Sequence, residues 1–454
     1  GALSDLGVTK EFDAAGSFTF PVGVPTDGGK YTPVTMNVTN TGGAPGTITV
    51  KPVDAPHPMR TNPDLDELQY FWSVSSTGFG ASPTVTHSYT YVDGDIEGDE
   101  GTYVDARMFE ETWYKQTETI DYDNNTINLS SANYIDGDYT AGEVTNWGIV
   151  HKYYSRNATG LWNNAGSWWI DSPTGPTVAS TAPNGNPVYI QTGHTITTNQ
   201  DDAYAGSVDI ATGAILDLGS TVGHNMGYIT GSGTIKIEAT GGGTFAFPAG
   251  DPSGFMNTSG STVNYDGSGT LPSNIFTYQN ILFTGNGDKT IPATNITVLG
   301  DLTISGGVLD NATNDRTISI EGNWTNNIVG GFDSGSGTVI FTGGNEQTIT
   351  ANGSEDFYNF TLNKTAGTSV TLSSPVNINR AFTLTSGIIN TDATNLLTLT
   401  WNSSLALTGG STTAYIDGPL RKNVQNSGYF TFPVGDDGRY GPVYISGVSS
   451  TGDQ

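Results

Sequence analysis

The residues whose types and spacing could do chemistry gather in an acid-rich segment between Asp93 and Glu143. The segment holds 14 Asp and Glu residues but only two basic ones, Arg107 and Lys115. Calcium takes six to eight oxygen ligands and tolerates irregular loops. Carboxylates stand at every second position around two glycines at the start of the segment, and these are the candidate Ca²⁺ ligands: Asp93, Asp95, Glu97 and Asp99. A solvated acidic loop is the alternative, because the spacing does not match an EF-hand.

The second half of the chain offers little for acid–base catalysis. Hydrolysis of a polysaccharide needs two carboxylates at a set separation, one of them protonated. Between Gly160 and Asp417 Asp201-Asp202 is an adjacent acid pair, but neighbours on a strand face opposite ways and make a poor dyad. Five basic residues are spread thinly over the same range: Lys236, Lys289, Arg316, Lys364 and Arg380. We therefore predict no catalytic residues and no enzyme activity.

Histidine and cysteine give no sign of a transition-metal site. The chain has no cysteine, which excludes disulfides and thiolate ligands. No two of its histidines fall at the spacing of zinc ligands: His57, His87, His151, His194 and His224. We expect His194 to be a hydrogen-bonded turn residue.

The tryptophans allow two interpretations. Exposed rings such as Trp324 and Trp401 could stack on sugars, whereas aromatic residues more often fill cores and cap the ends of repeats. Trp162, Trp168 and Trp169 stand where the pattern of the sequence changes. We expect these three to form a cap or plug between two domains.

Composition points to a β-protein that does not bind nucleic acid. The 454 residues carry 44 acidic and 16 basic side chains, a formal charge of −28, which is unfavourable for a polyanionic partner. Gly numbers 61 and only 13% of residues are charged, which excludes a helical bundle and favours strands joined by tight turns. No apolar run approaches the roughly 18 residues of a membrane span, so we predict no membrane insertion.

A repeated motif indicates that the chain is about one period of a longer array. Residues 16–23 read GSFTFPVG and residues 428–435 read GYFTFPVG, 412 positions later. A Tyr-x-Pro-Val segment follows both copies, at Tyr31 and at Tyr440. Upstream, Gly1-Ala2-Leu3 resembles Gly418-Pro419-Leu420. Together with a first residue that is not Met, these matches predict a segment of a longer repetitive protein.

Hydrophobic patterning divides the chain into three parts, all of them β. Alternating strands of sandwich spacing predict a β-sandwich at residues 1–157. Short apolar runs punctuated by Gly, Asn or Asp predict a parallel β-solenoid (β-helix) at residues 158–417, within which a block at 263–310 resembles one at 339–390. Residues 418–454 are expected to begin a second sandwich.

Two motifs together resemble large repetitive surface proteins of Bacteroidota. One is Gly160-Leu161-Trp162 with Gly166-Ser167-Trp168-Trp169, then Pro183, Val188-Tyr189-Ile190 and Gly193-His194-Thr195-Ile196. The other is Gly418-Pro419-Leu420-Arg421-Lys422 with the FTFPVG of residues 430–435. The N-terminal copy departs from the family pattern, since residues 1–6 lack the Arg-Lys pair. The resemblance implies type IX secretion, an extracellular or cell-surface location, and no known catalytic residues.

The expected function is a structural segment of an extracellular fibre or cell-surface adhesin, a stiff rod without catalytic activity. Its expected partners are other segments of the same long chain or copies of itself, and its one expected cofactor is calcium. The alternative is a secreted carbohydrate-binding or polysaccharide-processing β-helix protein, with surface glycans as partners.

Overall fold

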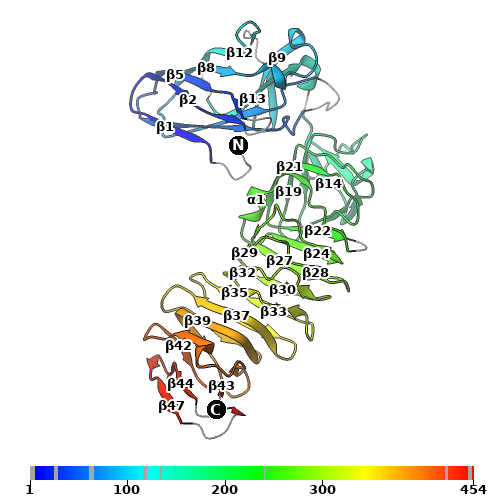
Figure 1. Ribbon diagram of the computed structural model, residues 1–454. Helices are drawn as coiled ribbons and strands as arrows, with labels where there is room; N and C mark the ends of the chain where they lie inside the picture. The colour runs from blue at the N-terminus through cyan, green and yellow to red at the C-terminus, as the bar shows by residue number, and fades with distance from the viewer. Residues whose placement is uncertain are drawn as a thin grey trace.

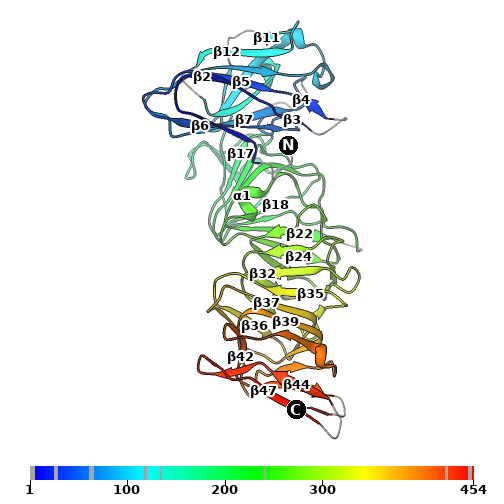
Figure 2. The ribbon, with the colours of Figure 1, turned by 60° about the vertical axis from the view of Figure 1, so that its left-hand side comes forward.

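The computed structural model describes residues 6–24, 29–60, 66–115, 120–132, 135–148, 150–239, 242–424, 428–447 and 452–453. Antiparallel sandwich-like sheets are followed by a parallel β-solenoid of about twelve turns, which confirms the predicted fold class. Figures 1 and 2 show the sandwich at one end of the solenoid and the C-terminus at the other. Within these ranges one short α-helix occurs, α1 (Ser253–Met256).

The sandwich buries alternate side chains of two antiparallel sheets against each other. In β6, for example, Ile48 and Val50 are fully buried while the residues between them are not. One sheet has the order β1 (Val8–Phe12), β6 (Gly46–Val53), β7 (Phe71–Thr77), β13 (Gly137–Glu143), β9 (Tyr103–Phe109) and β10 (Thr112–Lys115). The other has the order β11 (Ile120–Asp121), β12 (Thr126–Ala132), β8 (Thr84–Thr90), β5 (Val34–Asn40) and β2 (Gly16–Phe20). A small hairpin of β3 (Gly23–Val24) and β4 (Lys30–Tyr31) follows β2.

Each solenoid coil passes through up to three parallel faces. Face 1 runs the whole length: β15 (Thr159–Leu161), β18 (Thr195–Thr197), β20 (Ile215–Asp217), β22 (Thr234–Ala239), β24 (Thr262–Gly267), β27 (Asn280–Thr284), β30 (Leu302–Ile304), β33 (Trp324–Asn326), β36 (Gln347–Ala351), β38 (Ser369–Leu372), the end of β39 (Val376–Asn390), β42 (Ala414–Asp417) and β45 (Val434–Asp436). Face 3 is short: β25 (Gly269–Thr270), β28 (Lys289–Thr290), β31 (Leu309–Asp310) and β34 (Phe332–Asp333).

Face 2 precedes face 1 in every coil and is interrupted once, next to α1. Its first part is β16 (Trp168–Ile170), β14 (Tyr153–Ser155), β17 (Pro187–Ile190), β19 (Ser207–Ile210), β21 (Asn225–Gly231) and β23 (Ala249–Asp251). Its second part is β26 (Thr277–Tyr278), β29 (Ile296–Val298), β32 (Thr317–Ile320), β35 (Thr338–Phe341), β37 (Glu355–Asn363), the start of β39, then β40 (Leu397–Leu399), β41 (Leu407–Gly409) and β43 (Leu420–Val424). Since β14 already pairs in parallel with β17, the solenoid begins at Tyr153, inside the range assigned to the sandwich from sequence.

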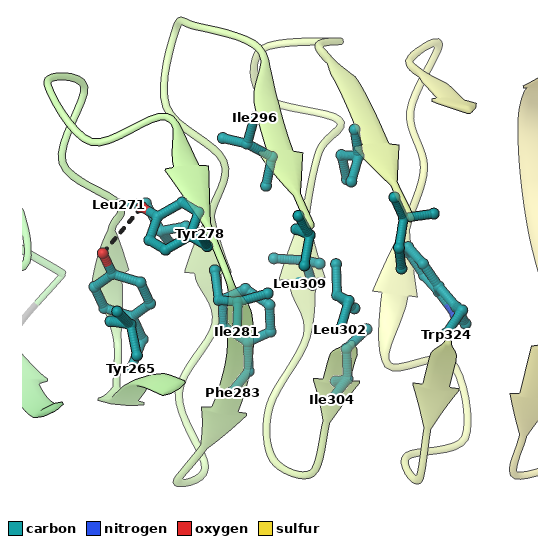
Figure 3. Packing of buried hydrophobic residues seen from close by; sticks show 14 of the residues in the cluster. Tyr265, Leu271, Tyr278, Ile281, Phe283, Ile296, Leu302, Ile304, Leu309 and Trp324 are labelled. Carbon is teal, nitrogen blue, oxygen red and sulfur yellow. Dashed lines mark hydrogen bonds between the residues drawn. The ribbon is translucent and has the colours of Figure 1, made fainter. Parts of the chain in front are cut away.

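Apolar residues stack in register from coil to coil inside the solenoid. One inward column of face 1, each member at most 1% exposed, is Ile196, Leu216, Ile235, Val263, Ile281, Leu302, Trp324 and Ile349. Figure 3 shows part of this packing, with the hydroxyls of Tyr265 and Tyr278 joined at 3.0 Å so that neither phenol is buried without a partner. Trp162 and Trp168 are fully buried in the first coil, where the indole N–H of Trp168 donates to the carbonyl of Trp162 at 2.9 Å.

Polar side chains form a second column at the turn that leads into face 1. The Oδ1 of Asn280 accepts the backbone N–H of Asp301 at 2.8 Å. The Oδ1 of Asp301 accepts the N–H of Asn323 at 2.7 Å, and the Oδ1 of Asn323 accepts the N–H of Thr348 at 2.9 Å. Each turn is therefore hydrogen-bonded to the next coil, which gives the Asn and Asp at these breaks a structural role.

The C-terminal segment repeats the first six strands of the sandwich in order and pairing. β43 pairs with β48 (Gly452–Asp453) as β1 pairs with β6, and β44 (Tyr429–Phe432) pairs with β47 (Val443–Ser446) as β2 pairs with β5. β45 pairs with β46 (Arg439–Tyr440) as β3 pairs with β4. This second copy also continues the solenoid, because β43 pairs in parallel with β40 and β45 with β42.

The strand pairings correct the sequence alignment of the two copies. The sequence resemblance of residues 1–3 to residues 418–420 falls on residues that lie outside the described ranges. In the structure β1 is the equivalent of β43, and the two strands are related by the same 412-residue offset as the FTFPVG motif. Lys10 then occupies the place of Lys422, so the N-terminal copy lacks only the arginine of the Arg-Lys pair. The match of residues 1–3 to residues 418–420 rests on similar residue types, and it departs from the 412-residue offset of the motif.

Candidate functional site

The acidic loop at residues 93–99 sends its four candidate ligands to different partners. Asp95 is buried at 5% exposure, and its carboxylate binds the ammonium of Lys30. Glu97 accepts the amide N–H of Gln69 at 2.7 Å, whereas Asp99 accepts the backbone N–H of Gly101 at 3.0 Å. The fourth, Asp93, accepts the side-chain amide of Asn125. The loop therefore fastens the β3–β4 hairpin and its own turns to the sandwich.

Two of the four candidates still face a common polar hollow. Asp93 and Asp99 line a depression of about 650 Å³ together with Glu100, Asp123 and Asn125. Sequence reasoning did not place Asp123 and Asn125 here, because they come from the β11–β12 turn some thirty residues away; the Asp-x-Asn pattern of that turn was the available signal. In the described part of the chain, no three His, Asp or Glu side chains form a ready-made metal-binding group. Calcium binding stays a prediction, and Asp93 and Asp99 are the two of its four candidates that line this hollow.

Glu100, which lines this hollow, is held by a hydrogen bond from a tyrosine. The hydroxyl of Tyr91 donates to Glu100 at 2.9 Å. Burial, and then the Glu100 hydrogen bond, raise the pKa of Tyr91. The phenol therefore stays protonated and donates to Glu100. This hydrogen bond would compete with a cation for the same carboxylate oxygen.

The solenoid uses its basic residues for structure. Lys289 is fully buried, and its ammonium donates to the carbonyls of Gly285 at 3.1 Å and Gly306 at 2.8 Å. Lys364 is 3% exposed and donates to the carbonyl of Asn345 at 2.8 Å. Burial lowers the pKa of both lysines. Each closes a turn by satisfying carbonyl groups that would otherwise be unpaired.

The aromatic platform proposed at Trp324 is wrong, because that ring is fully buried in the core. It occupies an inward position of β33, and its indole N–H donates to Glu355 at 2.8 Å. Trp401 is half-buried, and the guanidinium of Arg380 lies 3.7 Å from its ring centroid. One face of that ring is therefore already used in a cation–π contact.

Glu355 is a buried carboxyl group that sequence reasoning missed. It is 2% exposed and accepts from Trp324 at 2.8 Å and from the amide of Asn326 at 3.0 Å. Burial raises its pKa to about 7, against an ordinary value of 4.5. The signal was its place two residues before Phe357 on one inward-facing row of β37. Because it is enclosed by the core, we assign it to stability and not to catalysis.

A buried histidine sits where the sandwich meets the solenoid. His57 is fully buried and its ring packs on Trp113, with centroids 4.7 Å apart. Its Nδ1 accepts the backbone N–H of Met59 at 3.1 Å, which assigns the proton to Nε2. Nε2 then donates to Asp138 at 3.2 Å, and Tyr228 from the solenoid donates to the same carboxylate oxygen at 3.1 Å. One carboxylate thus ties both modules together.

Two further tyrosines of the first coils reach the sandwich. Tyr189 donates to Glu111, which also pairs with Lys152 at 2.7 Å. Tyr204 donates to the backbone carbonyl of Pro58. Together with the Tyr228 contact, these bonds spread the joint over three points on successive coils.

Two hollows lie near this joint. One, of about 440 Å³, is lined by both modules, with Asp54 and Phe71 on one side and Tyr228 and Asp251 on the other. A second, of about 720 Å³, lies beside α1 on the solenoid and is lined by apolar and amide side chains, among them Phe247, Met256, Asn257, Ile275 and Phe276. Phe276 is 55% exposed there. In this second hollow an aromatic ring faces solvent beside the amide of Asn257.

Comparisons with protein-family models, with curated proteins and with solved structures give no match. No helix in the described part of the chain is both long and apolar enough to cross a lipid bilayer.

The first prediction concerns Glu355. Its folded pKa is raised, so the folded state binds more protons than the unfolded state between pH 4.5 and about 7. The free energy of unfolding should therefore fall as pH rises through this window, by on the order of 3 kcal/mol, and level off above it. Glu355→Gln should flatten this slope between pH 5.5 and 8, as measured by chemical denaturation.

Glu238→Gln is the matched control, because Glu238 is exposed on face 1 and its side chain makes no hydrogen bond or ion pair with another residue that the structure describes. It should leave the slope unchanged. Equal slopes for the wild type and Glu355→Gln would contradict the assignment.

The second prediction concerns calcium. If the loop binds Ca²⁺ in the folded state alone, free calcium at about 100 times its Kd adds roughly 2.7 kcal/mol of stability. The melting temperature of the full chain should rise with calcium and return with chelator. The double variant Asp93→Asn, Asp99→Asn should lose the response, whereas Asp13→Asn should keep it. A melting temperature that does not respond to calcium makes this a solvated acidic loop.

Proposed function

We propose that this chain is a structural segment of an extracellular fibre or cell-surface adhesin, a stiff rod without catalytic activity. The observation that carries the proposal is the second copy of the sandwich strands, which is hydrogen-bonded into the last solenoid coil. Two copies of the same strands around one solenoid are the pattern of a repetitive array. The role of each module is then to carry load and to set spacing.

The joints support a mechanical role. At the C-terminal end of the solenoid, backbone pairing continues from β40 into β43 and from β42 into β45. At the N-terminal end, the hydroxyls of Tyr189, Tyr204 and Tyr228 bond to the sandwich, and Tyr228 packs against a shared apolar cluster. Bending at either joint would break hydrogen bonds, and those of the N-terminal joint are partly buried. Such joints resist bending better than a flexible linker does.

Residue chemistry supports the remaining parts of the proposal. Within residues 150–239 and 242–424, Lys236 is paired with Asp217 and Asp266, and Lys289 and Lys364 are buried on backbone carbonyls. None of the three is free to serve as a base. The charge of −28 favours solubility of a long exposed chain. The sequence resemblance to Bacteroidota surface proteins supports export by the type IX route.

The third prediction tests this function on the native polypeptide. Denaturing electrophoresis with peptide mapping should give a chain much longer than 454 residues, with several distinct FTFPVG peptides. This result is expected because two copies already flank one solenoid. A native chain of about 48 kDa with only these two copies would overturn the fibre proposal.

Carbohydrate binding is the second candidate, and the hollow beside α1 is the observation that favours it. Phe276 is exposed there next to Phe247 and Asn257, a combination of aromatic face and amide that suits a sugar ring. In this fourth prediction, saturable binding to a glycan array should be lost on Phe276→Ala. Leu405→Ala, an exposed apolar residue elsewhere on the solenoid, is the control. Absence of binding by the wild type removes this candidate.

A further inference from the structure

The two sandwich copies differ in what lies against their first strands. In the second copy, β43 and β45 each add to a solenoid face, with Leu420 opposite Leu397 and Val434 opposite Ile416. A pair of sandwich strands thus forms the last coil of a solenoid. The edge of the terminal coil is covered in this way.

In the first copy the equivalent strands are open on that side. β1 is the edge strand of its sheet and pairs only with β6, and β3 pairs only with β4, among the residues the structure describes. An open edge presents backbone N–H and C=O groups that can accept another strand. Lys10 in β1 does not prevent such pairing, because Lys422 at the same position lies within a paired strand.

Side chains at equivalent positions are more exposed in the first copy. Lys422 is fully buried and donates to the carbonyl of Trp401 in the last coil, whereas Lys10 is half-buried. Phe430 is 3% exposed and belongs to the solenoid core, whereas Phe18 is only partly buried. Removing the solenoid coil from the second copy would expose Lys422 and Phe430 in the same way.

A tyrosine shows the same difference on the hairpin. Tyr440 packs near Tyr415 of the solenoid, with ring centroids 6.0 Å apart. Its counterpart Tyr31, which pairs with Gly23 as Tyr440 pairs with Gly435, is 61% exposed. This ring has no such solenoid partner in the first copy.

The first copy already holds the geometry that docking requires. The ammonium of Lys10 lies 5.9 Å from the ring centroid of Phe18, and that of Lys422 lies 5.4 Å from Phe430. The same cation–π contact is thus formed with and without a solenoid beside it. A preformed surface of this kind loses little conformational freedom on binding.

We propose that the open edge of β1 and β3, with Lys10, Phe18 and Tyr31, docks the terminal coil of a preceding solenoid in the same chain, built like residues 376–417. The inference rests on the proposed function and adds the contact by which its modules are joined. Backbone pairing to β1 and β3 supplies the attraction, and Tyr31 and Lys10 set the register.

The fifth prediction uses a tandem chain in which residues 1–417 are followed directly by residues 6–454. Asp417 then meets Leu6 at the 412-residue offset, and every solenoid keeps its own sandwich. In hydrogen exchange followed by mass spectrometry, peptides covering β1 and β3 should show two equal populations, one exchanging at least tenfold more slowly. The 454-residue chain should show the fast population alone. Hydroxyl-radical labelling of Tyr31 should fall by about half, while the exposed control Tyr444 keeps its labelling.

A single fast population in the tandem chain would overturn the docking inference. Lys10→Gln supplies a second measurement, because it should lower the unfolding midpoint of the tandem chain by more than that of the 454-residue chain, where it removes the cation–π contact alone. Repeats in the native polypeptide with a single fast population would mean hinged modules, so that the inference fails and the fibre stands. Two exchange populations in the tandem chain, with no further repeats in the native polypeptide, would support the docking surface and overturn the fibre proposal.

Discussion

Backbone pairing between successive coils is the constraint on which the rest of the structure depends. Each strand of a parallel solenoid must find partners for its N–H and C=O groups above and below, and the first and last coils have a neighbour on one side only. The chain meets this requirement at both ends. Trp162 and Trp168 fill the first coil next to the antiparallel strand β16, and β43 and β45 of the second copy complete the last coil.

The unusual composition follows from the same constraint. A turn repeated about every twenty residues exposes backbone groups at each corner, and the chain satisfies them with short polar side chains such as Asn280, Asp301 and Asn323. Acids used in this way need no basic partner, which is consistent with an excess of 28 negative charges. Where a longer reach is needed, a buried lysine closes the corner, as Lys289 and Lys364 do.

Period and composition were sufficient to predict the architecture from sequence. Alternating burial in the sandwich and short apolar runs in the solenoid reflect strand geometry directly, and both predictions hold. Individual side chains were harder, because their surroundings come from distant strands. Trp324 looked like an exposed platform until its coil placed it inward, and the ion pair of Asp95 with Lys30 could not be foreseen from the sequence. Sequence spacing could not identify Glu355 and His57 as buried, hydrogen-bonded residues, because their partners lie dozens of residues away in the chain.

The joint at Asp138 has a consequence for shape at a larger scale. Twelve coils at about 4.8 Å each make a solenoid roughly 58 Å long. The joint at Asp138 fixes the rotation of this solenoid relative to the sandwich before it. One rotation and one translation applied again and again generate a helix. In the proposed fibre, contacts around His57, Asp138 and Tyr228, together with the pairing of β43 and β45, would therefore set the pitch and hand. A change of a few degrees there, too small to affect one module, would accumulate into a different superhelix.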